Sequence, residues 1–212
     1  MDLNTALEST YTCRYYREEV IEDQKLKKVL DAARWGPSGG NRQPVNLIVI
    51  KNREKKLALQ ELYLPLWEPY VEGIKKGEIK ISARDSNMLR AADHFAHNIS
   101  NIPVLIQVCA RLGDVHPTDI NLERLSIVGG ASVYPAVQNI LLSARSEGLG
   151  SALTTLLCSV EPNVKELLRI PEDVSTAAMI TLGYPSKAFP SKLNRKPIEE
   201  MCWSENFGEK FF

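Results

Sequence analysis

The chain has 212 residues, and its 26 basic and 26 acidic side chains give a formal net charge of zero. Because this balance creates no overall positive field, we expect no nucleic-acid partner and no membrane partner. The four cysteines form no Cys-x-x-Cys pair, no apolar run could cross a bilayer, and the first residues lack a signal-peptide pattern. These features predict a reduced, cytoplasmic protein without disulfide bonds.

The first clear element in chain order is an amphipathic helix. Leu26, Val29 and Ala33 recur at one-face helical spacing, and Asp23 is the predicted N-cap. The apolar run 47–50 follows and predicts a buried strand.

A glycine-rich loop, residues 36–44, separates that helix from that strand. Its sequence is Gly-Pro-Ser-Gly-Gly-Asn-Arg-Gln-Pro, which combines a bare backbone with the polar groups of Ser38, Asn41, Arg42 and Gln43. Such a loop can approach a planar ligand closely, but surface loops are polar by default. Both readings stay open on the residues alone.

Residues 61–96 look like a helical insertion. Tyr63, Trp67 and Tyr70 lie in its first half. Their rings could line a pocket or pack the inserted helices together, and the second reading is the safer default.

Further strands are predicted at 104–109 and 177–182, separated by helical segments. One helix follows Val133 and ends at Gly148, and another begins near Pro162. Strands alternating with helices indicate an α+β domain with a small central sheet.

The C-terminal tail, residues 198–212, is unusually aromatic. Half of the eight Trp and Phe residues fall in the last ten positions, as Trp203, Phe207, Phe211 and Phe212. Such a surface either docks on the body of the same chain or on a second subunit, and we favour the second.

Residue patterns for common catalytic centres are weak. His94 and His97 share a helix face beside Asp93 without a third ligand, no Cys-His pair is indicated, and Walker and Gly-x-Gly-x-x-Gly motifs are absent. We therefore expect no metal and no side-chain nucleophile. Arg14 and Arg195 could hold a phosphate.

The ordered set of motifs resembles the FMN-dependent nitroreductase family, in particular a bacterial NAD(P)H nitroreductase branch. The matching segments are Thr12-x-Arg14-x-Tyr16, Pro37-Ser38-Gly39-x-Asn41-x-Gln43-Pro44, Tyr134-Pro135-Ala136-x-Gln138-Asn139, Gly148-Leu149-Gly150, Leu182-Gly183-Tyr184-Pro185 and Arg195-Lys196-Pro197. The resemblance implies one domain, 1–212, with an α+β sandwich fold, a small mixed sheet and an intertwined homodimer holding FMN at the interface. It implies that 61–96 covers the flavin as a lid and that 198–212 docks on the partner.

Residue roles follow from the same resemblance. Contacts to FMN are implied for Arg14, Pro37, Ser38, Gly39, Asn41, Gln43, Leu153, Thr154, Thr155 and Arg195. The loop residues act in part from the opposite subunit, the 153–155 segment approaches the ring edge, and Arg195 binds the phosphate. Many members have a basic residue near the start of the first motif, where this chain has Thr10-Tyr11, so one phosphate contact is missing or supplied elsewhere.

The implied activity is ping-pong hydride transfer through flavin N5, from NADPH or NADH to nitroaromatics, quinones or other flat acceptors. Tyr63, Trp67 and Tyr70 could stack on such an acceptor. Two alternatives stay open: specialised FMN chemistry, namely reductive dehalogenation or flavin fragmentation, and a non-catalytic flavin-binding or redox-sensing protein.

Overall fold

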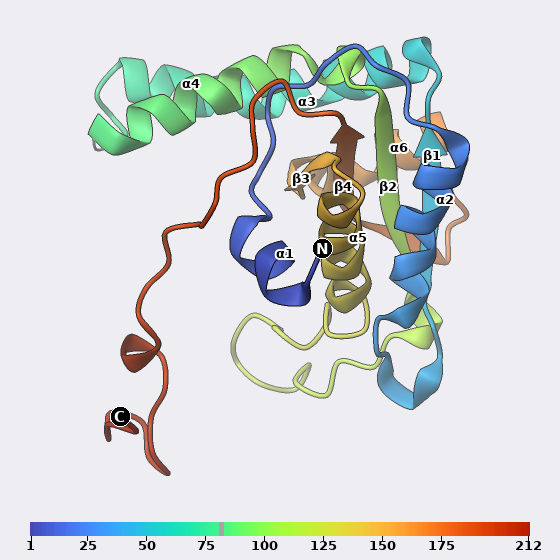
Figure 1. The fold of residues 1–212 in the computed structure, drawn as a ribbon. Helices are drawn as coiled ribbons and strands as arrows, with labels where there is room; N and C mark the ends of the chain where they lie inside the picture. Colours follow the sequence, from blue (N-terminus) through green and yellow to red (C-terminus); the bar gives the residue numbers. More distant parts are fainter. Residues whose placement is uncertain (81–82) are drawn as a thin grey trace.

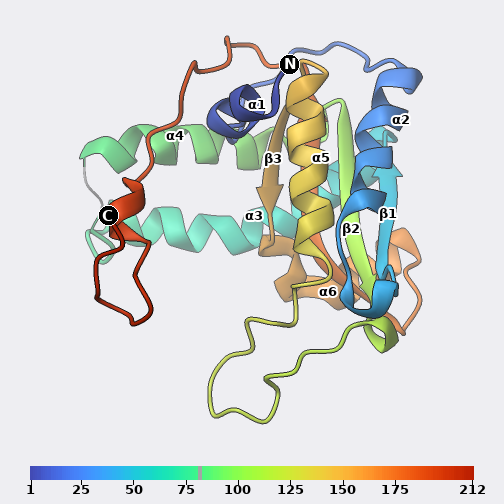
Figure 2. The ribbon, with the colours of Figure 1, turned by 60° about the horizontal axis from the view of Figure 1, so that its bottom comes forward.

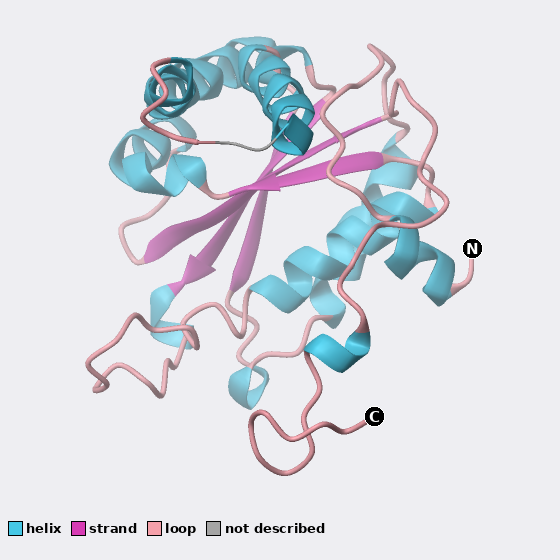
Figure 3. Cartoon of the chain, turned by 90° about the vertical axis from the view of Figure 1, so that its left-hand side faces the viewer, coloured by secondary structure: helices cyan, strands magenta, loops and turns pink. Residues whose placement is uncertain are grey.

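A four-stranded antiparallel sheet in the order β1-β2-β4-β3 lies at the centre of the computed structural model, which describes residues 1–80 and 83–212. The strands are β1 (Val45–Ile50), β2 (Val104–Arg111), β3 (Gly150–Thr154) and β4 (Val174–Gly183). The helices are α1 (Leu3–Ser9), α2 (Asp23–Asp31), α3 (Arg53–Lys75), α4 (Ala83–His97), α5 (Tyr134–Ser146) and α6 (Glu161–Leu168). Figure 1 shows the elements in chain order, and helices lie on both sides of the strands in Figure 3.

Each face of the sheet carries its own apolar core. Alternate residues of β2 and β4, such as Ile106 and Ile180, pack with Val29 of α2 and Ile140 of α5. The opposite face packs against α3 and α6. Because side chains alternate across a strand, both faces of the two central strands are buried and their sequence is almost continuously apolar.

The α+β class is confirmed, whereas the pairing of the strands differs from the expected mixed sheet. All neighbouring strands pair antiparallel, and among the described residues parallel pairing is limited to an isolated bridge between Thr12 and Ser151. The predicted strands at 47–50, 104–109 and 177–182 are confirmed and extend further at their ends.

Two local expectations need correction. Strand β3 was not predicted, because Gly-Ser-Ala-Leu-Thr is short and poor in β-branched residues. Asp23 is not the N-cap of α2: Glu22 holds that position, and the Asp23 carboxylate accepts a 2.7 Å hydrogen bond from Lys51.

Helices α3 and α4 lie side by side and project beyond the sheet (Figures 1 and 2). The proposed insertion at 61–96 begins inside α3, which runs unbroken across Glu61, and it includes most of α4. Residues 81–82 of the insertion lie outside the described residues. Among the described residues, no helix combines the length and hydropathy needed to cross a bilayer.

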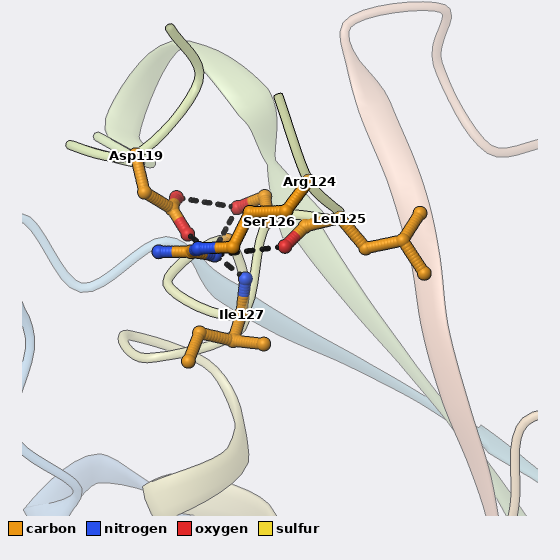
Figure 4. A network of polar contacts seen from close by, with 6 residues as sticks. Asp119, Arg124, Leu125, Ser126 and Ile127 are labelled. Carbon is orange, nitrogen blue, oxygen red and sulfur yellow. Dashed lines mark hydrogen bonds and ion pairs between the residues drawn. The ribbon is translucent and has the colours of Figure 1, made fainter. Parts of the chain in front are cut away.

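The long loop between β2 and α5 is built around a buried carboxylate, shown in Figure 4. Asp119 accepts hydrogen bonds from the Ser126 hydroxyl at 2.7 Å, the Arg124 guanidinium at 2.8 Å and the Ile127 backbone N–H at 3.0 Å. The Ser126 hydrogen bond is the largest of the effects that lower the pKa of Asp119 to about 2. This network fixes a loop whose apolar side chains face solvent, with Leu125 exposed by 90%.

The C-terminal tail leaves the body of the protein, as the red segment of Figures 1 and 2 shows. Its aromatic rings contact each other, with Trp203 tilted against Phe207 and Phe211 edge-on to Phe212. Phe207 is exposed by 93%. The tail therefore presents an apolar surface that this chain does not cover.

Candidate functional site

The backbone on either side of Arg14 is fixed by hydrogen bonds of its neighbours. The Cys13 N–H donates to the Ser151 carbonyl at 2.8 Å, and the Tyr16 hydroxyl donates to the Cys13 carbonyl at 2.8 Å. Gly150 permits this close approach, because a Cβ there would lie 2.6 Å from the Cys13 sulfur. Burial raises the pKa of the Cys13 thiol, so the thiol is protonated near neutral pH.

The Arg14 side chain lines a hollow of about 130 Å³ near the start of β2, together with Phe95 and Ile102. Glu18 lines the same hollow, but within the described residues the Arg14 guanidinium makes no hydrogen bond and no ion pair. A cation left unpaired in a hollow is suited to an anionic ligand.

Tyr63 and Thr154 complete what we call the arginine end: Arg14, Tyr63, Leu153 and Thr154. The Tyr63 hydroxyl lies 3.4 Å from Thr154 Oγ1. Burial raises the pKa of Tyr63, and the nearby Thr154 hydroxyl and Arg14 charge oppose that shift. Leu153, on the edge strand β3, is 39% exposed. The arginine end thus combines one charge, two hydroxyls and an open apolar side chain.

The glycine-rich loop forms a second polar region, the loop end, defined as residues 36–43 with Ser132. Ser132 Oγ accepts the Gly39 N–H at 3.0 Å, and Ser38 Oγ accepts the Gln43 N–H at 3.0 Å. The Gln43 side chain donates to Asn41 Oδ1 at 3.3 Å. Asn41 and Gln43 have backbone φ angles of 54° and 51°, which residues other than glycine rarely adopt. Backbone strain of this kind gathers at functional sites.

A hollow of about 230 Å³ opens beside this loop, lined by Ser38, Gln43 and apolar residues of α2, β1 and α5. Gly36 brings the loop against α5, since a Cβ there would lie 2.5 Å from the Ala136 nitrogen. Pro37 is exposed at the surface of the same loop.

The two ends lie at opposite ends of β2. Ile102, which lines the Arg14 hollow, lies two residues before the start of β2, whereas the Pro44 carbonyl accepts the N–H of Arg111, the last residue of β2. An eight-residue strand spans about 26 Å. One chain therefore does not bring the loop residues to Arg14. Thr154 and Thr155 also separate, since Thr155 lines a different hollow with Tyr134 and Cys158.

The remaining predicted residues are found in two places. Arg195 lies in an extended segment, its Nη1 donating to the Asn194 carbonyl at 2.9 Å, just after the Leu193 N–H bonds the Glu8 carbonyl of α1. On α3, Trp67 Nε1 donates to Asp93 of α4 at 3.0 Å and its ring lies 5.6 Å from that of Tyr70.

One cluster beside the N-terminal segment was not predicted from the sequence. Arg145, at the end of α5, donates through Nε to Ser9 Oγ at 2.8 Å, across 136 residues of sequence. Its guanidinium carbon lies 3.9 Å from the centre of the Phe189 ring, which in turn meets Tyr11 edge-on. No local pattern links these residues, so only the folded chain reveals them.

The histidines of α4 have other contacts. His94 stacks on Tyr15 with ring centres 4.4 Å apart, and His97 Nδ1 lies 2.9 Å from the Asp93 carbonyl. Within residues 1–80 and 83–212, no group of three His, Cys, Asp or Glu side chains is placed to share a metal ion.

Comparison with known proteins agrees with the resemblance. The profile of the nitroreductase family matches residues 7–184. A "Putative NADH dehydrogenase/NAD(P)H nitroreductase" of Methanothermobacter thermautotrophicus is 29% identical over 189 residues, covering 88% of this chain and 79% of the relative. An "Iodotyrosine dehalogenase 1 homolog" of Caenorhabditis elegans is 26% identical, covering 90% of this chain and 57% of the relative.

Among solved structures, a BluB-like flavoprotein of Clostridium difficile 630 superposes with a TM-score of 0.71 at 21% identity, covering 97% of this chain and 100% of that one. This similarity confirms the fold. Because the family profile spans well over half of the sequence, the chain belongs to the nitroreductase family and is a flavin-dependent oxidoreductase.

Proposed function

We propose that this protein is an FMN-dependent NAD(P)H oxidoreductase whose two flavin sites form between two copies of the chain. The observation that carries the proposal is the position of the arginine end and the loop end at opposite ends of β2. A second copy, related to the first by a two-fold axis, would set the loop end of each chain against the arginine end of the other.

The residues at both ends fit a flavin. A flavin is flat, carries polar atoms along one edge and, as FMN, ends in a phosphate. The arginine end offers an unpartnered cation, the Thr154 hydroxyl and the half-exposed Leu153. The loop end offers amide groups and a backbone that approaches its neighbours closely. This donor set suits a planar ligand that becomes negatively charged when reduced.

Exposed apolar side chains support a second copy as the partner. Leu153 on the edge strand, Tyr134 at the start of α5, and Phe207 and Phe211 of the tail are all exposed in the single chain. Apolar surface of this extent marks protein–protein contacts in soluble proteins. We propose that residues 198–212 dock on the partner subunit.

A bound flavin supplies hydride transfer, accepting hydride from NADPH or NADH and passing it to the acceptor. Arg14 contributes a fixed positive charge that stabilises negative charge on a ring beside it. Thr154 already accepts the Leu156 N–H at 3.3 Å, so its hydroxyl hydrogen is oriented away from that bond, toward Tyr63 or a ligand. The rings of Trp67 and Tyr70, 5.6 Å apart and tilted by 47°, remain with Tyr63 our candidates to stack on the acceptor, a nitroaromatic or quinone.

The shared site has a direct test. Two inactive variants are co-expressed with different affinity tags: Arg14→Ala, and a loop variant carrying Asn41→Ala with Gln43→Ala. In a mixed dimer one site would collect both lesions and the other would be intact. We expect each homodimer to be inactive and the mixed dimer to recover about half of the wild-type flavin content and NAD(P)H oxidation. If Arg14 and the loop served the same site within one chain, the mixed dimer would stay inactive.

The identity of the acceptor is tested separately with a panel of candidate substrates. Similarity to the iodotyrosine dehalogenase homolog favours reductive dehalogenation as a second candidate function. Steady-state oxidation of NADPH and NADH with nitroaromatics, quinones and halogenated phenols separates the two. Preference for halogenated phenols would overturn our first choice, and absence of turnover with every acceptor would indicate a flavin-binding protein without catalysis.

A further inference from the structure

The N-terminal motif lacks the basic residue that resemblance to the family implies near Thr10-Tyr11. The folded chain brings a cation to this place from another element. Arg145 of α5 is bonded to Ser9, one residue before Thr10, and its guanidinium stacks on Phe189, which contacts the Tyr11 ring. Arg145, which is distant in sequence, thus lies beside the position where the N-terminal motif lacks a basic residue.

Within the part of the chain that the structure describes, the Arg145 guanidinium is held in place without a carboxylate counterion. Its Nε donates to a neutral hydroxyl, and its face is covered by an aromatic ring. Within the described residues its two terminal nitrogens have no hydrogen-bond acceptor. Partial burial disfavours the charged form and lowers the pKa of Arg145, with the nearby Tyr11 opposing the shift. A half-buried cation of this kind gains most from a bound anion.

Other cations line the same segment. The stretch 186–195 runs beside residues 8–15, joined by the Ser186 N–H to the Tyr15 carbonyl and the Leu193 N–H to the Glu8 carbonyl. It carries Lys187 over the Tyr15 ring at 4.6 Å, and Arg195 just beyond Leu193. Glu8 is neutralised by Lys192 at 2.9 Å. The segment 186–195 therefore adds positive charge beside the Arg145 guanidinium.

We propose that Arg145 binds the phosphate of FMN in this chain and replaces the missing basic residue of the N-terminal motif. Arg14 lies three positions after Tyr11, whose ring contacts the Phe189 ring that covers Arg145. Both arginines thus flank the same short N-terminal segment, and we assign Arg14 to the ring and Arg145 to the phosphate of one cofactor. The inference rests on the proposed function and adds the residue that distinguishes FMN from riboflavin.

The test measures phosphate recognition rather than activity. Flavin-free protein is titrated with FMN and with riboflavin, and binding is followed by quenching of flavin fluorescence. In Arg145→Gln we expect FMN affinity to fall about 10- to 100-fold, as for loss of a hydrogen bond to a charged group, while riboflavin affinity changes less than about twofold. Arg53→Gln, at an exposed arginine in the first turn of α3, is the matched control and should change neither affinity.

Arg145 also ties α5 to α1, so a structural effect must be separated from phosphate binding. Arg145→Lys keeps the charge but not the planar fork, and we expect a smaller loss that is again specific for FMN. Equal losses for FMN and riboflavin, or no loss for FMN, would overturn the assignment while leaving the proposed function intact. Wild-type protein that binds neither flavin would overturn both.

Discussion

At the loop end Asn41 and Gln43 hold positive φ angles and the polar groups bond to one another, whereas Arg14 of the arginine end and Arg145 of α5 lie on ordinary backbone and, within the described residues, make no ion pair. The first region is shaped by backbone strain and short-range hydrogen bonds. The second is shaped by electrostatics and by aromatic contacts between distant segments. The loop end can therefore form without a ligand. At the arginine end we expect a bound anion to neutralise the positive charge.

The largest expected effect is at the arginine end. Arg14→Ala should lower flavin content and reduce turnover on the order of 100-fold, because a preorganised charge is lost where negative charge develops. Absorbance of the purified protein and steady-state NAD(P)H oxidation measure both effects. Arg14→Lys, which keeps the charge, should retain most of the flavin. Full flavin occupancy and normal turnover in Arg14→Ala would show that the Arg14 charge is needed for neither flavin binding nor turnover.

A matched pair of glycine variants tests the loop end. Gly36→Ala places a Cβ 2.5 Å from a backbone nitrogen of α5, whereas at Gly113 no atom lies within 4 Å. Overpacking against rigid backbone should lower the free energy of unfolding by about 1 to 3 kcal/mol, and Gly113→Ala should change it by less than about 0.5 kcal/mol. Urea unfolding of both variants makes the measurement. Equal stabilities would mean that the loop is free to move away from α5.

The difference between local and long-range contacts explains which features of the fold and the site could be predicted from the sequence. The motif at 36–44, the strands β1, β2 and β4 and the helix ending at Gly148 depend on residues close in sequence, and their patterns identified them. The contact of Arg145 with Ser9 joins residues 136 positions apart, and no spacing rule could reveal it. The separation of Arg14 from the loop by the length of β2 was equally hidden, because motifs give the order of residues but not their distance in space.

The support of the loop end depends on pH. Asp119 organises the segment that delivers Ser132 to Gly39, and hydrogen bonds lower its pKa to about 2, below the usual value near 4. A lowered folded-state pKa gives stabilisation that is complete above pH 4 and is lost as the pH falls toward 2. The loop end should therefore loosen in acid before the arginine end does.

Pepsin, which works in this pH range and cleaves beside large apolar residues, can follow that change. Cleavage at Leu122 and Leu125 should accelerate between pH 4 and pH 2 relative to the same cleavage in Asp119→Asn, which serves as the reference. In Asp119→Asn the loop should be cut rapidly throughout the range. A constant ratio between the two proteins would show that the carboxylate does not hold the loop.

The smallest expected effect on stability separates strain from function. In Gln43→Gly the φ of 51° becomes unstrained, but the freer glycine loses more entropy on folding, so stability should change by less than about 1 kcal/mol. The backbone bond from residue 43 to Ser38 Oγ survives, while the side-chain amide is removed. We therefore expect nearly unchanged unfolding in urea together with weaker FMN binding. Loss of stability by several kcal/mol would mean that the Gln43 side chain holds the fold, and unchanged FMN affinity would remove it from the site. Either result would contradict the view that Gln43 serves ligand binding rather than the stability of the fold.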